Sequence, residues 1–111
     1  MTYYAVMREP TFLILTAMAA QPLHGYGIIQ SVARLSDDEV VLRPGTLYGA
    51  LDRLVDSDLI ATDREEVVDG RLRRYYRLTE AGAQALAVQA ERFRQRVAVA
   101  EAQLRLRQAP A

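Results

Sequence analysis

The sequence of 111 residues contains no cysteine and no lysine, and His24 is its single histidine. Without cysteine the chain cannot form disulfides or cysteine-ligated zinc or iron–sulfur sites, and one histidine could bind a metal only together with carboxylates. The sequence also lacks a glycine-rich phosphate-binding loop. We therefore expect neither an enzyme nor a bound cofactor or metal. The lack of cysteine is compatible with a reducing cytoplasm, which is the location we expect.

The absence of lysine means that every basic side chain is an arginine. Arginine forms a better fork than lysine for phosphates and guanine edges, but a GC-rich coding sequence would produce the same bias, so both explanations remain open. The formal net charge is zero, unlike that of a basic nucleic-acid-binding protein. The charge is nevertheless uneven: residues 36–42 and 59–70 each carry minus three, whereas residues 71–77 carry plus four.

No apolar segment approaches the ~20 residues needed to span a bilayer. The most apolar one, residues 11–20, ends in Ala17-Met18-Ala19 and thus loosely resembles a secretion signal with a small-residue cleavage site. The residues before it include Glu9 as well as Arg8, unlike the basic leader of such a signal. We therefore expect a buried first helix and no membrane association. Half of all residues are apolar, which is enough for one domain with a hydrophobic core.

Hydrophobic periodicity and turn signals predict helices and a β-hairpin. The expected helices cover residues 9–20 and 24–35, a segment that begins at Pro44, and a segment from a Thr79-Glu80 cap to about Arg107; the expected strands cover residues 40–42, 59–68 and 71–78. Tyr26 is expected in the core. We therefore predict a mainly α-helical fold with a small β-hairpin: a winged helix-turn-helix over residues 1–78, a C-terminal helix over residues 79–107 and a frayed tail over residues 108–111.

The helix that begins at Pro44 is the first candidate for binding a partner. Its apolar side is expected to carry Leu47, Leu51, Leu54 and Val55. The other side is small and polar at the start, where Gly45 and Thr46 would let a helix N-terminus approach phosphates or base edges. Asp52 and Asp56 on that side would repel phosphate, so contacts should concentrate in the first turn. Any globular helix has an apolar and a polar side, so this pattern alone does not establish binding.

The Asp69-Gly70 turn predicts a tight hairpin that leads into a basic, aromatic strand. A two-residue turn sets these pairs: Val68 opposite Arg71, Glu66 opposite Arg73, and Glu65 opposite Arg74. Two arginines thus have acidic cross-strand partners, whereas Arg71 has none. A hairpin held by salt bridges and a wing that reaches DNA both remain possible interpretations. In the second, Arg71 would make the strongest single contact.

The last predicted helix carries a heptad seam of apolar residues. The seam consists of Ala83, Leu86, Ala90, Phe93, Val97, Ala100 and Leu104. It could pack on its own domain or on a second copy of the chain. A helix of this length spans roughly 40 Å at ~1.5 Å per residue, so it projects beyond so small a domain. This favours a homodimer, with Leu86 to Leu104 as its contact residues and the first helix contributing.

Taken together, the motifs resemble one known family. They are His24-Gly25-Tyr26, Pro44-Gly45-Thr46-Leu47-Tyr48, Ala50-Leu51, Arg53-Leu54, Gly70-Arg71, Arg73 to Tyr76, and Arg77-Leu78-Thr79 with Gly82. Over residues 9–90 the chain resembles PadR-type transcriptional regulators of the compact kind with a single C-terminal dimerisation helix. The resemblance implies a homodimer that binds double-stranded DNA at a pseudo-palindromic operator and acts as a repressor released by a small effector.

The resemblance also implies roles for individual residues. Gly45, Thr46 and Tyr48 would belong to the recognition helix, and Arg71 and Arg73 would belong to the wing, which we expect them to anchor. Independently of the resemblance, we expect Arg43 and Arg53 to bind phosphate. The chain departs from the family pattern at Gly27, Gly49 and Asp58; Asp58 stands where glycine usually ends the recognition helix, so it would have to adopt a left-handed conformation.

Two further expectations concern partners. An apolar or aromatic effector is expected between the first and last helices, near Tyr3, Tyr4, Met7 and Phe93. The alternative to a DNA-binding regulator is a winged-helix protein-interaction module without DNA binding, which the zero net charge and the acids of the third helix favour. The arginine run over residues 71–77 argues against that alternative.

Overall fold

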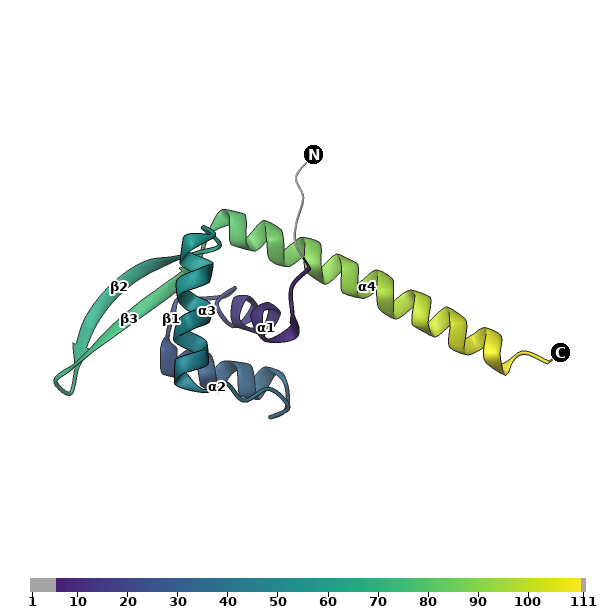
Figure 1. Cartoon of the computed structure of the whole chain (residues 1–111), viewed down its shortest axis with the longest axis horizontal. Helices are drawn as coiled ribbons and strands as arrows, with labels where there is room; N and C mark the ends of the chain where they lie inside the picture. The colour runs from purple at the N-terminus through teal and green to yellow at the C-terminus, as the bar shows by residue number, and fades with distance from the viewer. Residues whose placement is uncertain (1–5, 111) are drawn as a thin grey trace.

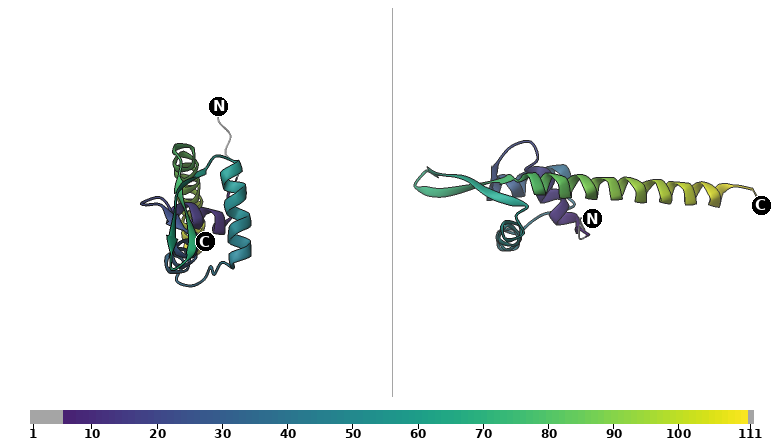
Figure 2. Two further views of the ribbon diagram at one scale, coloured as in Figure 1. Left: turned by 90° about the vertical axis from the view of Figure 1, so that its left-hand side faces the viewer. Right: turned by 90° about the horizontal axis from the view of Figure 1, so that it is seen from above.

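The computed structural model describes residues 6–110, within which the chain forms four helices and three strands. In chain order they are α1 (Glu9–Ala17), β1 (Leu23–His24), α2 (Gly25–Leu35), α3 (Pro44–Asp56), β2 (Ile60–Val68), β3 (Arg71–Leu78) and α4 (Glu80–Gln108) (Figure 1). Helices α1 to α3 and the base of the β2–β3 hairpin form a globular part, and α4 projects from it on the side away from the hairpin (Figures 1 and 2). The longest dimension is 68 Å. The predicted winged helix-turn-helix with a long C-terminal helix is thus confirmed.

The core lies where α1, α2, α3 and the base of the hairpin meet. Its most deeply buried apolar side chains are Ile14, Leu15, Met18, Ile28, Val32, Leu47, Leu51 and Ile60. In α3 the buried positions are three and four residues apart, as the predicted apolar stripe requires. Val55 was wrongly expected in that stripe: it is 39% exposed and lies beside a shallow groove that Thr62 also lines.

Helix α2 packs one side against the core, and that side does not include Tyr26. Its buried residues are Gly25, Ile28, Ser31 and Val32, again three and four apart. Tyr26 is 63% exposed, so its assignment to the core was wrong. The first helix, α1, ends at Ala17 rather than Ala20 because the N–H groups of Met18 and Ala19 bond to carbonyls only three residues back, which tightens the last turn.

The three strands form an antiparallel sheet in the order β1-β3-β2. The hairpin register is the predicted one from Val68↔Arg71 to Arg64↔Tyr75, and a bulge at Asp63 then shifts it so that Thr62 faces Tyr76. The expected strand at residues 40–42 does not form. Both edges of β3 are already occupied, on one side by β2 and on the other by the two-residue strand β1.

A tight joint links the end of α3 to the start of α4. Asp58 adopts a left-handed conformation with φ of 61°, as predicted for the end of α3. The hydroxyl of Thr79 donates to the carbonyl of Asp58 at 2.7 Å and accepts from the N–H of Gly82 at 2.9 Å, which caps α4. A side chain at Gly82 would collide with the carbonyl oxygen of Leu59, since a Cβ there would lie 2.0 Å from it. Only glycine allows the two segments to approach this closely.

Helix α4 has a packed first part and an exposed second part. Gly82, Ala85 and Gln89 are buried against the globular part, and Phe93 packs edge-to-face on Phe12 with ring centroids 5.0 Å apart. Of the predicted dimerisation residues, Leu86 packs against the core, whereas Val97 and Leu104 are more than half exposed and Ala100 is also exposed. Among residues 6–110, no helix has the length and apolar character needed to cross a membrane.

Candidate nucleic-acid interface

The start of α3 forms one part of the candidate interface. Pro44 occupies the first turn, and Arg43 precedes it with an extended backbone, as expected for a residue that begins a helix. Gly45 and Thr46 are exposed, while Leu47 is fully buried and holds this turn against the core. The start of α3 therefore presents small side chains and free helix N–H groups to solvent.

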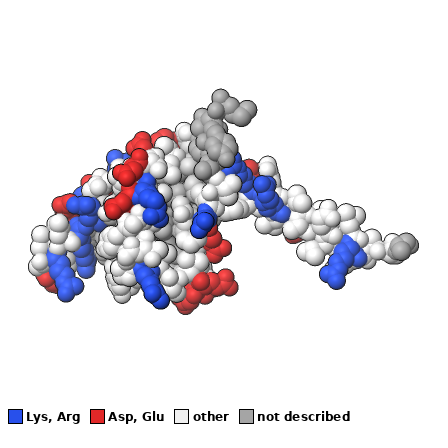
Figure 3. Space-filling model, in the orientation of Figure 1, with Lys and Arg blue, Asp and Glu red and all other residues white. Residues whose placement is uncertain are grey.

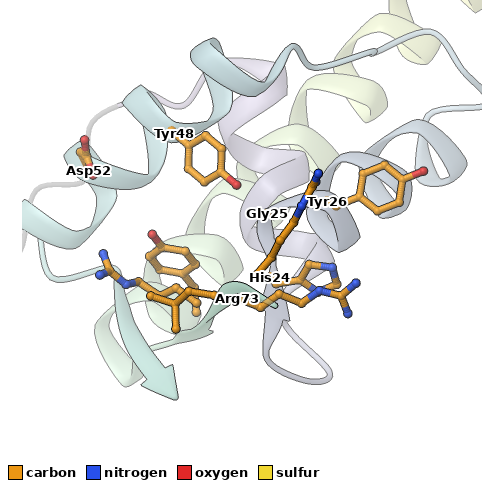
Figure 4. Close-up of a pocket in the computed structure, with 10 residues that line it drawn as sticks. His24, Gly25, Tyr26, Tyr48, Asp52 and Arg73 are labelled. Carbon is orange, nitrogen blue, oxygen red and sulfur yellow. The ribbon is translucent and has the colours of Figure 1, made fainter. Parts of the chain in front are cut away.

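A groove of about 630 Å³ lies between α3, the start of α2 and strand β3 (Figure 4). Its walls consist of His24, Gly25, Tyr26, Tyr48, Asp52, Arg71, Leu72, Arg73, Arg74 and Tyr76. Of the residues predicted to bind DNA, the groove brings together Tyr48, Arg71 and Arg73. Arg43, Gly45, Thr46 and Arg53 do not line it and are exposed on or beside α3.

Sequence reasoning missed several residues of this groove. Tyr26 was assigned to the core, and Gly25 was given no role in a binding site. Leu72 lines the groove although it is 61% exposed. The signal that could have identified Tyr26 is its position directly after His24-Gly25, where the helix begins and an outward-facing aromatic ring can lie at the mouth of a groove.

Ion pairs sort the arginines of the hairpin into two groups. Arg74 donates to Glu65 at 3.0 Å, and the arginines at positions 64 and 77 both pair with Asp63. Within residues 6–110, by contrast, Arg71 and Arg73 have no acidic partner. The cross-strand pair expected between Arg73 and Glu66 was therefore wrong, whereas the pair between Arg74 and Glu65 is confirmed.

The hydroxyl of Tyr75 explains the missing pair. It donates to Oε1 of Glu66 at 2.6 Å, while Nε of Arg64 lies 3.9 Å from Oε2, so both oxygens of the carboxylate that faces Arg73 across the strands already have partners. The guanidinium of Arg64 lies 3.9 Å from the centroid of the Tyr75 ring. The imidazole of His24 also packs on Tyr75, with the two ring centroids 5.2 Å apart. This cluster ties the base of the wing to β1 and leaves Arg73 available for an external anion.

His24 adds little positive charge to the groove at neutral pH. Burial lowers the pKa of its imidazole below the usual 6.5, and the nearby positive charge of Arg73 lowers it further, while Glu66 acts in the opposite direction. The imidazole is therefore mostly neutral at pH 7. The positive charge of this groove comes from the arginines of β3.

The acidic residues limit where an anion can approach. Asp52 lines the groove and Asp56 lies one turn further along α3, and both are exposed. In the view of Figure 3, basic and acidic side chains alternate over the globular part, in keeping with the zero net charge. An anionic partner would therefore meet favourable charge at the start of α3 and on β3, not along the whole of α3.

The arrangement of these elements defines a class of protein. Three helices, of which the third is exposed at its start, are followed by a hairpin at their side, which is the winged form of the helix-turn-helix. Residues 14–88 match the model of the transcriptional regulator PadR-like family. The chain therefore belongs to this family of transcriptional regulators.

Individual relatives agree with this assignment. A transcriptional regulator from Mycobacterium tuberculosis is 41% identical over 73 residues, which cover 66% of this chain and 64% of the relative. The crystal structure of a PadR family transcription regulator from Clostridium difficile superposes with a TM-score of 0.73 at 26% identity, covering 87% of this chain and 99% of that one. Bacillus subtilis PadR, crystallised in complex with operator DNA, has a TM-score of 0.64 at 23% identity over 72% of this chain and 46% of its own. At 23% identity, the similarity to the Bacillus subtilis protein shows a shared fold.

Proposed function

We propose that this chain is a cytoplasmic repressor that binds a pseudo-palindromic DNA operator as a homodimer and is released by a small effector. The start of α3 would enter the major groove, and the wing would follow the flanking backbone or minor groove. The observation that carries the proposal is the sorting of the arginines. Within the described residues, Arg71 and Arg73 on the wing, Arg43 just before α3 and Arg53 on α3 have no ion-pair partner, so their guanidinium groups are available for phosphates.

The roles of the individual residues follow from their positions. Thr46 and Tyr48 would position the helix or touch bases, because they lie at the exposed start of α3. Gly45 would let the sugar-phosphate backbone of DNA approach α3 closely, since it has no side chain and no other part of the protein lies within 4 Å of the place where its Cβ would be. Asp52 would turn the remainder of α3 away from phosphate. The binding energy would therefore come from the first turn of α3, the wing and the presence of two copies.

The second half of α4 supports dimerisation. Val97, Ala100 and Leu104 continue the heptad seam beyond the globular part and are exposed in the single chain. An exposed apolar seam of this kind gains stability from burial against a second helix. In a twofold dimer the recognition helices would then reach half-sites about one helical turn, ~34 Å, apart.

An effector site is proposed between α1 and α4, as the sequence suggested. A groove of about 360 Å³ there is lined by Phe12, Leu13 and Leu35, by Phe93 from α4, and by the polar residues Glu9, Ser36 and Glu39. Aromatic and aliphatic walls of this kind suit an apolar or aromatic compound. Met7 packs against the neighbouring core, whereas Tyr3 and Tyr4 lie outside the described residues. A thermal-shift screen without any apolar hit, with DNA binding intact, would refute this part of the proposal.

Selection from random DNA duplexes with purified protein tests the DNA-binding function. We expect an enriched pseudo-palindrome, and we expect its affinity to fall steeply as salt rises because bound counterions are released from the phosphates. A flat affinity between low and physiological salt would contradict the mechanism. The same selection tests the second candidate, a protein-interaction module, which Asp52 and Asp56 on α3 favour; that function predicts that no duplex is enriched.

A further inference from the structure

Gly25, the first residue of α2, makes close contact with Tyr48 of α3. A Cβ at position 25 would lie 2.6 Å from the hydroxyl oxygen of Tyr48, 3.0 Å from its Cζ and 3.2 Å from its Cε1. All three atoms belong to the phenol ring, and no backbone atom is among them. Figure 4 accordingly shows the ring of Tyr48 pointing from α3 toward Gly25.

The backbone gives no reason for a glycine at this position. Among the glycines of residues 6–110, Gly70 alone has a positive φ, so alanine could adopt the conformation of Gly25 without strain. Alanine would also favour the helix that begins here. What excludes a side chain at position 25 is therefore the phenol ring that lies against it.

Tyr48 lines the groove, but its hydroxyl group makes no hydrogen bond within the described part of the protein. Tyr48 is 49% exposed, it lines the same groove as Arg71 and Arg73, and its hydroxyl has no hydrogen-bond partner within residues 6–110. A phenol hydroxyl can both donate and accept a hydrogen bond. In this place it faces the space that the two arginines of the wing also border.

We propose that Gly25 is a positioning residue for DNA binding: the absence of a side chain lets the phenol of Tyr48 lie across the start of α2, so that its hydroxyl stays in the groove and donates to a phosphate or base oxygen. The inference rests on the proposed DNA-binding function. It adds Gly25 to the residues needed for binding: Gly25 would not contact DNA itself but would fix the position of Tyr48, which would.

The test compares variants of the whole chain on the duplex enriched by selection. Gly25→Ala should push the ring out of the groove, which a half-exposed side chain can accommodate by rotation. We expect this variant to retain cooperative thermal unfolding and to bind about tenfold more weakly. Gly27→Ala is the matched control on the same helix, because its Cβ would meet the His24 ring at an ordinary 3.4 Å; we expect its affinity to be unchanged.

A double-mutant cycle separates positioning from a general structural effect. In the Tyr48→Ala background, Gly25→Ala should change the affinity less than about twofold, since there is no ring left to displace. A tenfold loss in that background would overturn the inference, and so would a Gly25→Ala protein that binds as tightly as the original chain.

Tyr48→Phe gives a second measurement in case Gly25→Ala fails to fold. It keeps the ring against Gly25 and removes only the hydroxyl, so we expect weaker binding with an unchanged unfolding temperature. Unchanged binding by Tyr48→Phe would refute the inference. If the original chain enriches no duplex at all, the proposed DNA-binding function fails. That result is distinct from the failure of the inference about Gly25, in which the original chain binds a duplex and the variants bind it equally well.

Discussion

The globular part and the projecting half of α4 use apolar residues in opposite ways. In α3, Leu47 and Leu51 are completely buried by neighbours from the same chain. In α4, Val97 is 56% exposed and Leu104 is 55% exposed, although their spacing is as regular. A regular apolar stripe therefore specifies a helix with a buried face, but it does not specify which chain buries that face. The two cases can be distinguished by experiment, because burial of the projecting half of α4 against a second chain should depend on protein concentration, whereas burial of the core should not.

The largest effect is expected from removing a core side chain. Leu47→Ala should lower the free energy of unfolding by about 3 kcal/mol, because it deletes a fully buried side chain and leaves a cavity. Urea unfolding at a fixed protein concentration measures this loss. Leu106→Ala is the control, since Leu106 is 67% exposed and should cost less than ~0.5 kcal/mol. Equal losses would mean that the projecting half is packed as tightly as the core.

Dimerisation should be sensitive to one side of α4 only. Val97→Asp places a charge in the heptad seam and should weaken self-association at least ~100-fold, since an unpaired charge resists burial. Sedimentation should then report monomers at concentrations where the original chain is dimeric, together with weaker operator binding. Val99→Asp is matched in chemistry and exposure but lies off the seam, so the dimer should persist. Monomers from both variants, or from neither, would contradict the assigned face.

The same contrast between paired and free groups applies to the arginines of the wing. Arg71→Ala should weaken operator binding about tenfold and reduce the slope of affinity against salt by ~1, as expected for one lost phosphate contact. Arg74→Ala should change affinity less than about twofold, because Arg74 already bonds to Glu65 at 3.0 Å. Titrations at several salt concentrations provide both numbers. Equal losses would argue against this division of the arginines.

The smallest effect concerns pH and the base of the wing. The pKa of His24 is lowered in the folded protein, so between pH 7 and 5 the unfolded chain binds more protons there than the folded one. This contribution to stability is present above the unfolded pKa of about 6.5 and is lost as the pH falls. His24→Phe keeps a ring beside Tyr75 but cannot take a proton. Its unfolding temperature should therefore fall less than that of the original chain between about pH 7.5 and 5.5; an equal fall would contradict the shift.

Much of the fold follows from local signals. Pro44 and the spacing of the leucines define α3, and the two-residue turn at Asp69-Gly70 sets the hairpin register as far as Arg64↔Tyr75. Strand β1 could not be predicted in this way, because two residues are too few to show a period of two. The bulge at Asp63 also follows no local rule; it lets the base of the hairpin join the core.

The candidate site was less predictable than the fold. The charge pattern correctly identified Arg71 as a residue without an acidic partner. The strand register alone could not show that Arg73 also lacks one, because Tyr75 and Arg64 both compete with it for the carboxylate of Glu66. The contact between Gly25 and Tyr48 joins two helices and has no signature within either of them. Contacts of this kind are tertiary, so they became visible only when the elements were placed together.

The joint at Gly82 has a mechanical consequence for a dimer. Because the carbonyl of Leu59 lies where a side chain would be, and Thr79 bonds to Asp58, the end of α3 and the first turn of α4 are locked to each other. Helix α4, which is 29 residues long, then moves together with α3 as one rigid body, so a tilt of that body by about 5° displaces the far end of α4 by about 4 Å at ~1.5 Å of length per residue. In the proposed dimer, a partner or effector that tilts the far end of α4 slightly would therefore change the separation of the two α3 helices.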